Sequence, residues 1–104
     1  MSAAVRVDPS LAGILPRYLE ICRAESAALL EAALNRDLES TRLLGHRLKG
    51  SGASYGLAEI SRLGGEAEAA SLAGDRARVL ALSGELARYL ENLDVICGED
   101  ACKS

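Results

Sequence analysis

His46-Arg47-Leu48-Lys49-Gly50-Ser51-Gly52-Ala53-Ser54-Tyr55-Gly56 is the stretch around which the chain is organised, and it begins with the only histidine among 104 residues. Lys49 and Gly50 follow His46 by three and four positions, and side chains at these offsets share one face of an α-helix. One helix face therefore presents an imidazole, a cation and a residue without a side chain. Such a face suits a histidine that accepts a phosphoryl group while another protein docks over it.

The residues around His46 separate into two faces when they are placed at 100° intervals on a helix. The face opposite His46 is expected to be buried, and it holds Thr41, Leu44, Leu48, Ser51 and Tyr55. The outer face near His46 holds Arg42, Lys49, Gly50 and Ala53. Leu43 lies about 60° from His46 by the same geometry, so we expect an exposed apolar side chain beside the histidine.

An apolar stripe at helical spacing predicts a helix before this stretch, formed by Leu15, Tyr18, Leu19, Cys22, Ser26, Leu29, Leu30 and Ala33. Asp8-Pro9 has the features of a helix start. Pro16 either begins a second helical segment or kinks the first, so a short extra N-terminal helix is one of two expectations. Asp37 is suited to cap the helix that carries His46.

Two further helices are predicted after the stretch. The stripe of the third, over about residues 57–72, consists of Leu57, Ile60, Leu63, Gly64, Ala67 and Ala70. Its Gly64-Gly65 pair costs about 1 kcal/mol per glycine relative to alanine, and close approach of another helix would be a reason to accept that cost. Gly74-Asp75 indicates a helix stop followed by an N-cap. The last stripe predicts a helix ending near Gly98, with Val79, Leu82, Leu86, Tyr89, Leu90, Leu93 and Ile96.

Four amphipathic helices with short connections predict an all-α fold, an up-down antiparallel four-helix bundle. The bundle is expected to span residues 9–98, between flexible tails at 1–8 and 99–104, and to contain no sheet. We expect a monomer.

Composition excludes several classes of protein. A chain of 104 residues with 49 % hydrophobic residues forms a single domain with a real core. A net charge of −3 argues against nucleic-acid binding. No apolar run approaches the length of a membrane span, and the first residues lack the apolar segment of a signal peptide, so we expect a cytoplasmic protein. The cysteines, Cys22, Cys97 and Cys102, are expected to be free thiols.

The string His46-x-Leu48-Lys49-Gly50-Ser51, followed by Gly56, resembles the signature of histidine-containing phosphotransfer (HPt) domains. The similarity covers nearly the whole chain, because flanking helices have the expected length and it continues through Leu57, Ile60, Leu63, Glu68 and Gly74-Asp75. The resemblance implies that His46 accepts a phosphoryl group from a receiver-domain aspartate and passes it to another receiver domain.

The chemistry of phosphoryl transfer assigns expected roles to the neighbours of His46. A neutral imidazole has one nitrogen with a free lone pair, which can attack phosphorus in line. Transfer depends mainly on positioning and on charge compensation, which Lys49 can supply and Arg42 can add to. The alternative for both is an ordinary solvated side chain, and for Arg42 we prefer it.

The resemblance also implies that a polar side chain from the neighbouring helix accepts the proton of the other ring nitrogen. Glu68 stands at the matching position. A carboxylate there would fix the tautomer and stabilise positive charge on the ring. A plain surface glutamate is the equally weighted alternative.

The expected partners are receiver domains of response regulators or of hybrid histidine kinases. The expected docking residues are Arg42, Leu43, Arg47, Gly50 and Ala53. The basic charges of Arg42, Arg47 and Lys49 suit a partner with an acidic pocket. Gly50 either leaves room for that partner or permits internal packing. We expect no cofactor, and we expect the Mg²⁺ for transfer to be held by the receiver, because this chain has no acidic cluster of its own.

Other functions fit the sequence less well. The chain contains no Gly-rich nucleotide loop, so it is expected to be a phosphoryl carrier rather than a kinase. A non-catalytic helical-bundle interaction module that docks a receiver or a kinase is the main alternative. A histidine-kinase dimerisation domain usually has an acidic residue where Arg47 stands here, and two helices per subunit. A metal-dependent hydrolase is the least supported reading.

Overall fold

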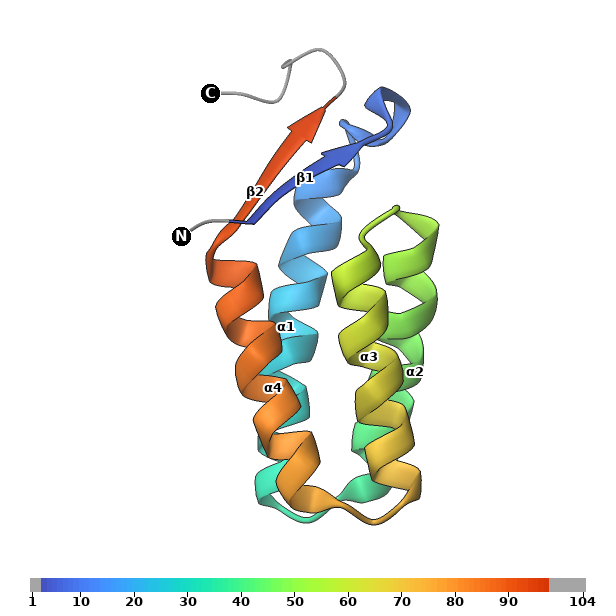
Figure 1. Cartoon of the computed structure of the whole chain (residues 1–104), viewed down its shortest axis with the longest axis vertical. Helices are drawn as coiled ribbons and strands as arrows, with labels where there is room; N and C mark the ends of the chain where they lie inside the picture. The colour runs from blue at the N-terminus through green and yellow to red at the C-terminus, as the bar shows by residue number, and fades with distance from the viewer. Residues whose placement is uncertain (1–2, 98–104) are drawn as a thin grey trace.

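The computed structural model places four α-helices in an up-down antiparallel bundle and describes residues 3–97, with side chains for residues 8–93 (Figure 1). The helices are α1 (Leu15–Leu34), α2 (Leu38–Ser54), α3 (Ala58–Leu72) and α4 (Arg76–Glu91). A 3₁₀ helix, η1 (Pro9–Leu11), precedes them and is capped by Asp8. The predicted fold class and the short extra N-terminal helix are therefore confirmed.

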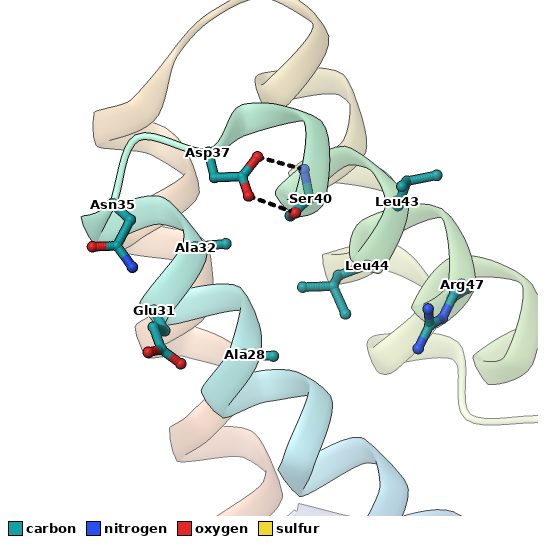
Figure 2. Close-up of a pocket in the computed structure, with 9 residues that line it drawn as sticks. All are labelled: Ala28, Glu31, Ala32, Asn35, Asp37, Ser40, Leu43, Leu44 and Arg47. Atoms are coloured by element: carbon teal, nitrogen blue, oxygen red, sulfur yellow. Dashed lines mark hydrogen bonds between the residues drawn. The ribbon is translucent and has the colours of Figure 1, made fainter.

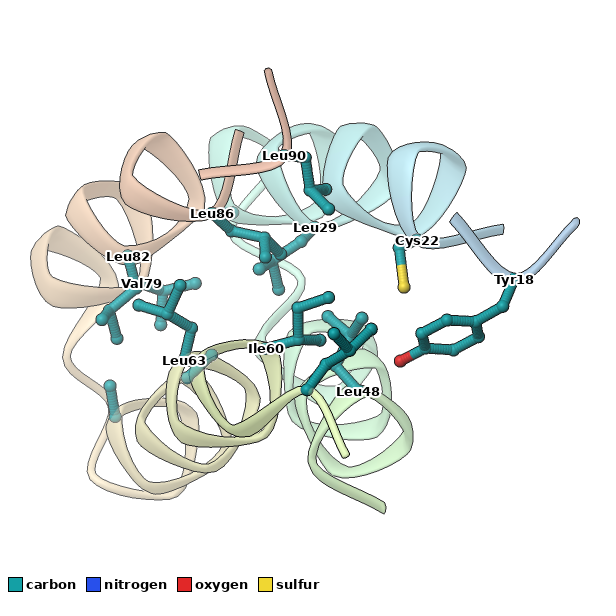
Figure 3. Close-up of a cluster of buried hydrophobic side chains, with 14 of the residues drawn as sticks. Tyr18, Cys22, Leu29, Leu48, Ile60, Leu63, Val79, Leu82, Leu86 and Leu90 are labelled. Atoms are coloured by element: carbon teal, nitrogen blue, oxygen red, sulfur yellow. The ribbon is translucent and has the colours of Figure 1, made fainter. Parts of the chain in front are cut away.

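The core lies between the four helices, which are arranged so that α1 and α3 each pack against both α2 and α4. Figure 3 shows aliphatic side chains from all four helices converging there. The fully buried ones include Leu29, Leu48, Leu57, Ile60, Val79, Leu82 and Leu86. No helix in the described part of the chain is both long and apolar enough to cross a membrane.

The predicted apolar stripes match the observed burial with one main exception. All six residues predicted for the stripe of α3 are buried. Leu30 of α1 was expected in the core, but 44 % of it is exposed. It lies in a groove between α1 and α4 beside Ala27, which has only a methyl group, and Gly84, which has no side chain, so these two do not cover it.

Each connection between helices passes through one residue in the left-handed region, at Arg36 (φ 61°), Gly56 (φ 73°) and Gly74 (φ 74°). After α2, the N–H of Leu57 donates to the carbonyl of Gly52 at 2.8 Å, and this bond closes a Schellman motif. Asp37 and Asp75 then cap α2 and α4 by accepting from backbone N–H groups three residues later. The predicted caps at Asp37 and Asp75 and the predicted stop at Gly74 are thus confirmed.

The chain ends form a small sheet, so the expectation that the fold contains no sheet is wrong. Strand β1 (Ala3–Val7) pairs in parallel with β2 (Leu93–Cys97), from Ala3 opposite Leu93 to Val7 opposite Cys97 (Figure 1). Residues 1–8 were expected to be a flexible tail and the last helix to reach Gly98, but α4 ends at Glu91. β-branched Val95 and Ile96 favour a strand once a partner strand is available, which local periodicity does not reveal. The expected tail at 99–104 lies outside the described residues.

Helices α2 and α3 come into backbone contact because glycines stand where they cross. A Cβ atom placed on Gly45 would lie 2.7 Å from the backbone nitrogen of Glu68. On Gly52 it would lie 2.6 Å from the nitrogen of Ser61, and on Gly64 it would lie 2.6 Å from that of Lys49. The close approach expected at Gly64 is present. We call the row Gly45, Gly52 and Gly64 the glycine seam.

A matched pair of substitutions within α2 tests the seam. Gly52→Ala is expected to lower the free energy of unfolding by about 1–3 kcal/mol, because overpacking forces the two backbones apart. Gly50→Ala is the control: a Cβ there meets nothing within 4 Å, so the better helix propensity of alanine should raise stability by up to about 1 kcal/mol. Thermal or urea unfolding measures both. Equal effects for the two variants would contradict the close approach of α2 and α3.

Candidate functional site

His46 lies near the middle of α2 with 67 % of its side chain exposed. The opposite face of α2 is held against the bundle, since Thr41 and Leu48 are fully buried. Tyr18 of α1 fixes the same face further along, because its hydroxyl lies 2.8 Å from Oγ of Ser51 and its ring stacks on Tyr55. These contacts set the rotation of α2, and the imidazole therefore faces solvent.

Glu68 of α3 meets the imidazole directly. Nδ1 of His46 lies 3.1 Å from Oε2 of Glu68, whose side chain is only 20 % exposed. The seam makes this contact possible, because Gly45, the residue before His46, packs against the backbone of Glu68. Because an ionised carboxylate can only accept, this contact favours, in a neutral imidazole, the tautomer in which Nδ1–H donates to Glu68 and Nε2 keeps the free lone pair. Glu68 is thus a partner of the imidazole and not an isolated surface glutamate.

The three cationic side chains around His46 differ in their ion pairs. Arg42 donates to Glu39 at 2.7 Å, and this hydrogen bond raises the pKa of the Arg42 guanidinium above its ordinary value. Arg47 donates to Glu25 of α1, also at 2.7 Å. Lys49 has no ion-pair partner among residues 8–93. Of these three cations, Lys49 is therefore the one that is not paired with a carboxylate among residues 8–93.

Gly50 and Ala53 place little or no side chain on the surface beside the histidine. Both are exposed, and a Cβ on Gly50 would meet nothing within 4 Å. Internal packing therefore does not explain Gly50, and its expected role in docking a partner stays a prediction.

A groove of about 380 Å³ runs between α1 and α2 next to this face. Figure 2 shows Leu43, Leu44 and Arg47 of α2 on one side and Ala28 and Ala32 of α1 on the other. Leu43 is 45 % exposed, as expected from the helical wheel. The contribution of α1 was missed, although small alanines spaced one turn apart are the signal that could have indicated a helix face open to a partner.

Metal ligands do not gather at this site or elsewhere in the described residues, where no group of three His, Cys, Asp or Glu side chains is placed to hold an ion. What the site does combine is an exposed nitrogen nucleophile, a carboxylate behind it, the cation of Lys49 one turn away and an open surface. This combination can accept a small electrophilic group from a partner protein that approaches over Gly50.

Comparison with known proteins agrees with this geometry. A family model described as "Hpt domain" matches residues 17–95, which is more than half of the chain. Comparison with curated proteins and with solved structures gave no match. The matched range contains His46, Lys49 and Glu68 together with all four helices except the first residues of α1.

The contact between His46 and Glu68 predicts the tautomer of the imidazole. In the neutral ring, Nδ1 is expected to carry the proton, and Glu68→Ala should shift the population toward the Nε2–H form because the acceptor is lost. Long-range ¹H–¹⁵N correlation spectra of the labelled protein distinguish the two nitrogens. Glu66→Ala on the same helix is the control, since Glu66 pairs with Arg62 and Arg78. An unchanged tautomer ratio in Glu68→Ala would contradict the contact.

Proposed function

Because the chain belongs to the Hpt domain family, whose members serve histidine phosphotransfer in phosphorelays and interact with receiver domains, we propose that His46 is the phosphoacceptor. In this proposal His46 takes the group from a receiver-domain aspartate and passes it to another receiver domain. The observation that carries the proposal is an exposed imidazole whose Nδ1 is bound to Glu68. This arrangement leaves Nε2 as the nucleophile on the solvent side.

The proposed step is an in-line displacement at phosphorus. Nε2 of His46 attacks the phosphorus of the aspartyl phosphate, a nitrogen–phosphorus bond forms, and the bond to the carboxylate oxygen breaks. The carboxylate leaves with the electron pair. The proton stays on Nδ1, where Glu68 stabilises the positive charge that the ring gains. Transfer to the second receiver is the same step in reverse.

Lys49 is proposed to compensate charge on the phosphoryl oxygens. Phosphoryl transfer relies on positioning and electrostatic stabilisation more than on covalent help from the protein. Lys49 stands one helical turn from His46 and has no carboxylate partner in the described part of the chain. Arg42 is engaged by Glu39, which supports the reading of Arg42 as a surface side chain or a docking residue.

We propose that the receiver covers the outer face of α2 and the adjoining groove. Gly50 and Ala53 would lie under its active site, while Leu43 and Arg47 would contact it at the edge of the groove.

The Mg²⁺ for transfer would belong to the receiver. The protein would act in the cytoplasm as a monomer. A module that only docks a partner would have no use for a carboxylate on Nδ1, which is why we prefer the carrier.

Replacing the nucleophile tests the proposal most directly. His46→Gln is expected to abolish phosphoryl acceptance while leaving the fold intact, because an exposed side chain contributes little to stability. The measurement is transfer of label from a phosphorylated receiver, with circular dichroism as the control for folding. The wild-type label should be acid-labile, as a phosphoramidate is. Label on the mutant would show a different acceptor, and an unlabelled wild-type protein that still binds the receiver would support the docking module.

Gly50 allows the docking surface to be tested separately. Gly50→Gln is expected to keep the melting temperature and slow transfer strongly, since a displacement of about 1 Å between reacting atoms can cost on the order of a hundredfold. Gly50→Ala is the matched control with the smallest added volume. Rates are measured as transfer from the receiver to His46, per folded molecule. A large loss of stability with a normal rate would reject the docking role of Gly50.

A further inference from the structure

Gly65, in the middle of α3, has no packing reason of the kind that explains Gly64. Glycine in a helix interior is unfavourable relative to alanine. A Cβ on Gly64 would collide with the backbone of α2, whereas the three atoms nearest to a Cβ on Gly65 would all belong to the side chain of Lys49. Its distances to Cδ, Cγ and Cε of Lys49 would be 3.4, 3.7 and 3.9 Å. The surface left bare by Gly65 is therefore covered by the alkyl chain of Lys49.

The contact between Lys49 and Gly65 lies one turn from the contact between His46 and Glu68. On each helix the two contacting residues are three positions apart, so the two contacts lie along the same edge of the α2–α3 pair. The backbone of Lys49 is held as well. Its nitrogen packs against Gly64, and its carbonyl accepts a hydrogen bond from Oγ of Ser61 at 2.8 Å. Helix α3 thus constrains Lys49 through both its backbone and its alkyl chain.

We propose that Gly65 is a positioning residue for Lys49. The missing side chain leaves a path along α3 for the alkyl chain, which keeps the ammonium group on the side of the helix pair where His46 and Glu68 meet. A lysine chain that already lies along a surface loses less freedom when its ammonium binds a phosphoryl oxygen. This inference rests on the proposed function, because it assigns Gly65 a part in charge compensation during phosphoryl transfer.

The space at Gly65 distinguishes a small substitution from a large one. The distances of 3.4–3.9 Å are ordinary van der Waals separations, so Gly65→Ala should fit beside the Lys49 chain. It should raise the melting temperature and keep the transfer rate. Gly65→Leu places a branched side chain in the path and should displace Lys49. Its effect on transfer should therefore depend on the presence of Lys49.

A double-mutant cycle tests this dependence with wild type, Gly65→Leu, Lys49→Ala and the double variant. The rate of transfer from a phosphorylated receiver is measured for each protein. Lys49→Ala is expected to slow transfer by about tenfold to a hundredfold, the range for loss of one contact to a charged group. Gly65→Leu should produce most of that loss. The double variant should be no slower than Lys49→Ala, because the lysine side chain that the introduced leucine would displace is already absent.

The control is Gly84→Leu in α4, at another glycine inside a helix, where a Cβ would approach only Nη1 of Arg88, at 3.6 Å. It should leave the transfer rate unchanged, and melting temperatures of all variants check folding. A wild-type rate for Gly65→Leu, or losses that multiply in the double variant, would overturn the inference. A normal rate for Lys49→Ala would overturn it too, while labelling of His46 would still uphold the proposed function. An unlabelled wild-type protein would reject both.

A measurement on the resting protein needs no transfer reaction. The geometry predicts nuclear Overhauser effects between the α protons of Gly65 and the γ and δ methylene protons of Lys49. Their presence supports a lysine chain that lies along α3 before any partner binds. Their absence would overturn the inference even if His46 proves to be the phosphoacceptor.

Discussion

Backbone contact between α2 and α3 is the constraint on which the site depends. Helices packed through ordinary side chains have axes about 8–10 Å apart, and the glycine seam removes those side chains at Gly45, Gly52 and Gly64. The short separation brings Glu68 within hydrogen-bonding distance of His46. Each glycine lowers helix propensity by about 1 kcal/mol. The burial of Leu48, Ile60 and Leu63 along the same pair of helices works against that cost.

The other two helices hold this pair in place. Tyr18 of α1 bonds to Ser51 and stacks on Tyr55, which fixes the rotation of α2. Arg76, at the start of α4, donates to the carbonyl of Ala33 at 2.7 Å and so satisfies the C-terminal end of α1. The pair α2 and α3 therefore holds His46, Lys49 and Glu68 together, while α1 packs against α2 and supplies one wall of the groove in Figure 2.

Charge around the histidine is divided in a way that composition does not reveal. The chain carries a net charge of −3, yet three cationic side chains surround His46. Two of them are paired with Glu39 and Glu25. Surface ion pairs contribute little to stability, but these two hold the guanidinium groups of Arg42 and Arg47 at defined places beside the exposed face of α2 around His46. Lys49 keeps its alkyl chain against Gly65, and no carboxylate among residues 8–93 pairs with its ammonium group.

The sequence alone determined the four helices, their caps and the exposure of His46, because a period of 3.6 residues assigns every residue of a helix to a face. It also indicated Glu68 and Gly64, the first through the family resemblance and the second through the cost of glycine in a helix. Only the tertiary structure decided which carboxylate pairs with Arg47, that Gly45 and Gly52 join the seam, and that Ala3–Val7 pairs with Leu93–Cys97. These features depend on distances between segments far apart in the chain, and the periodicity within one segment contains no information about them.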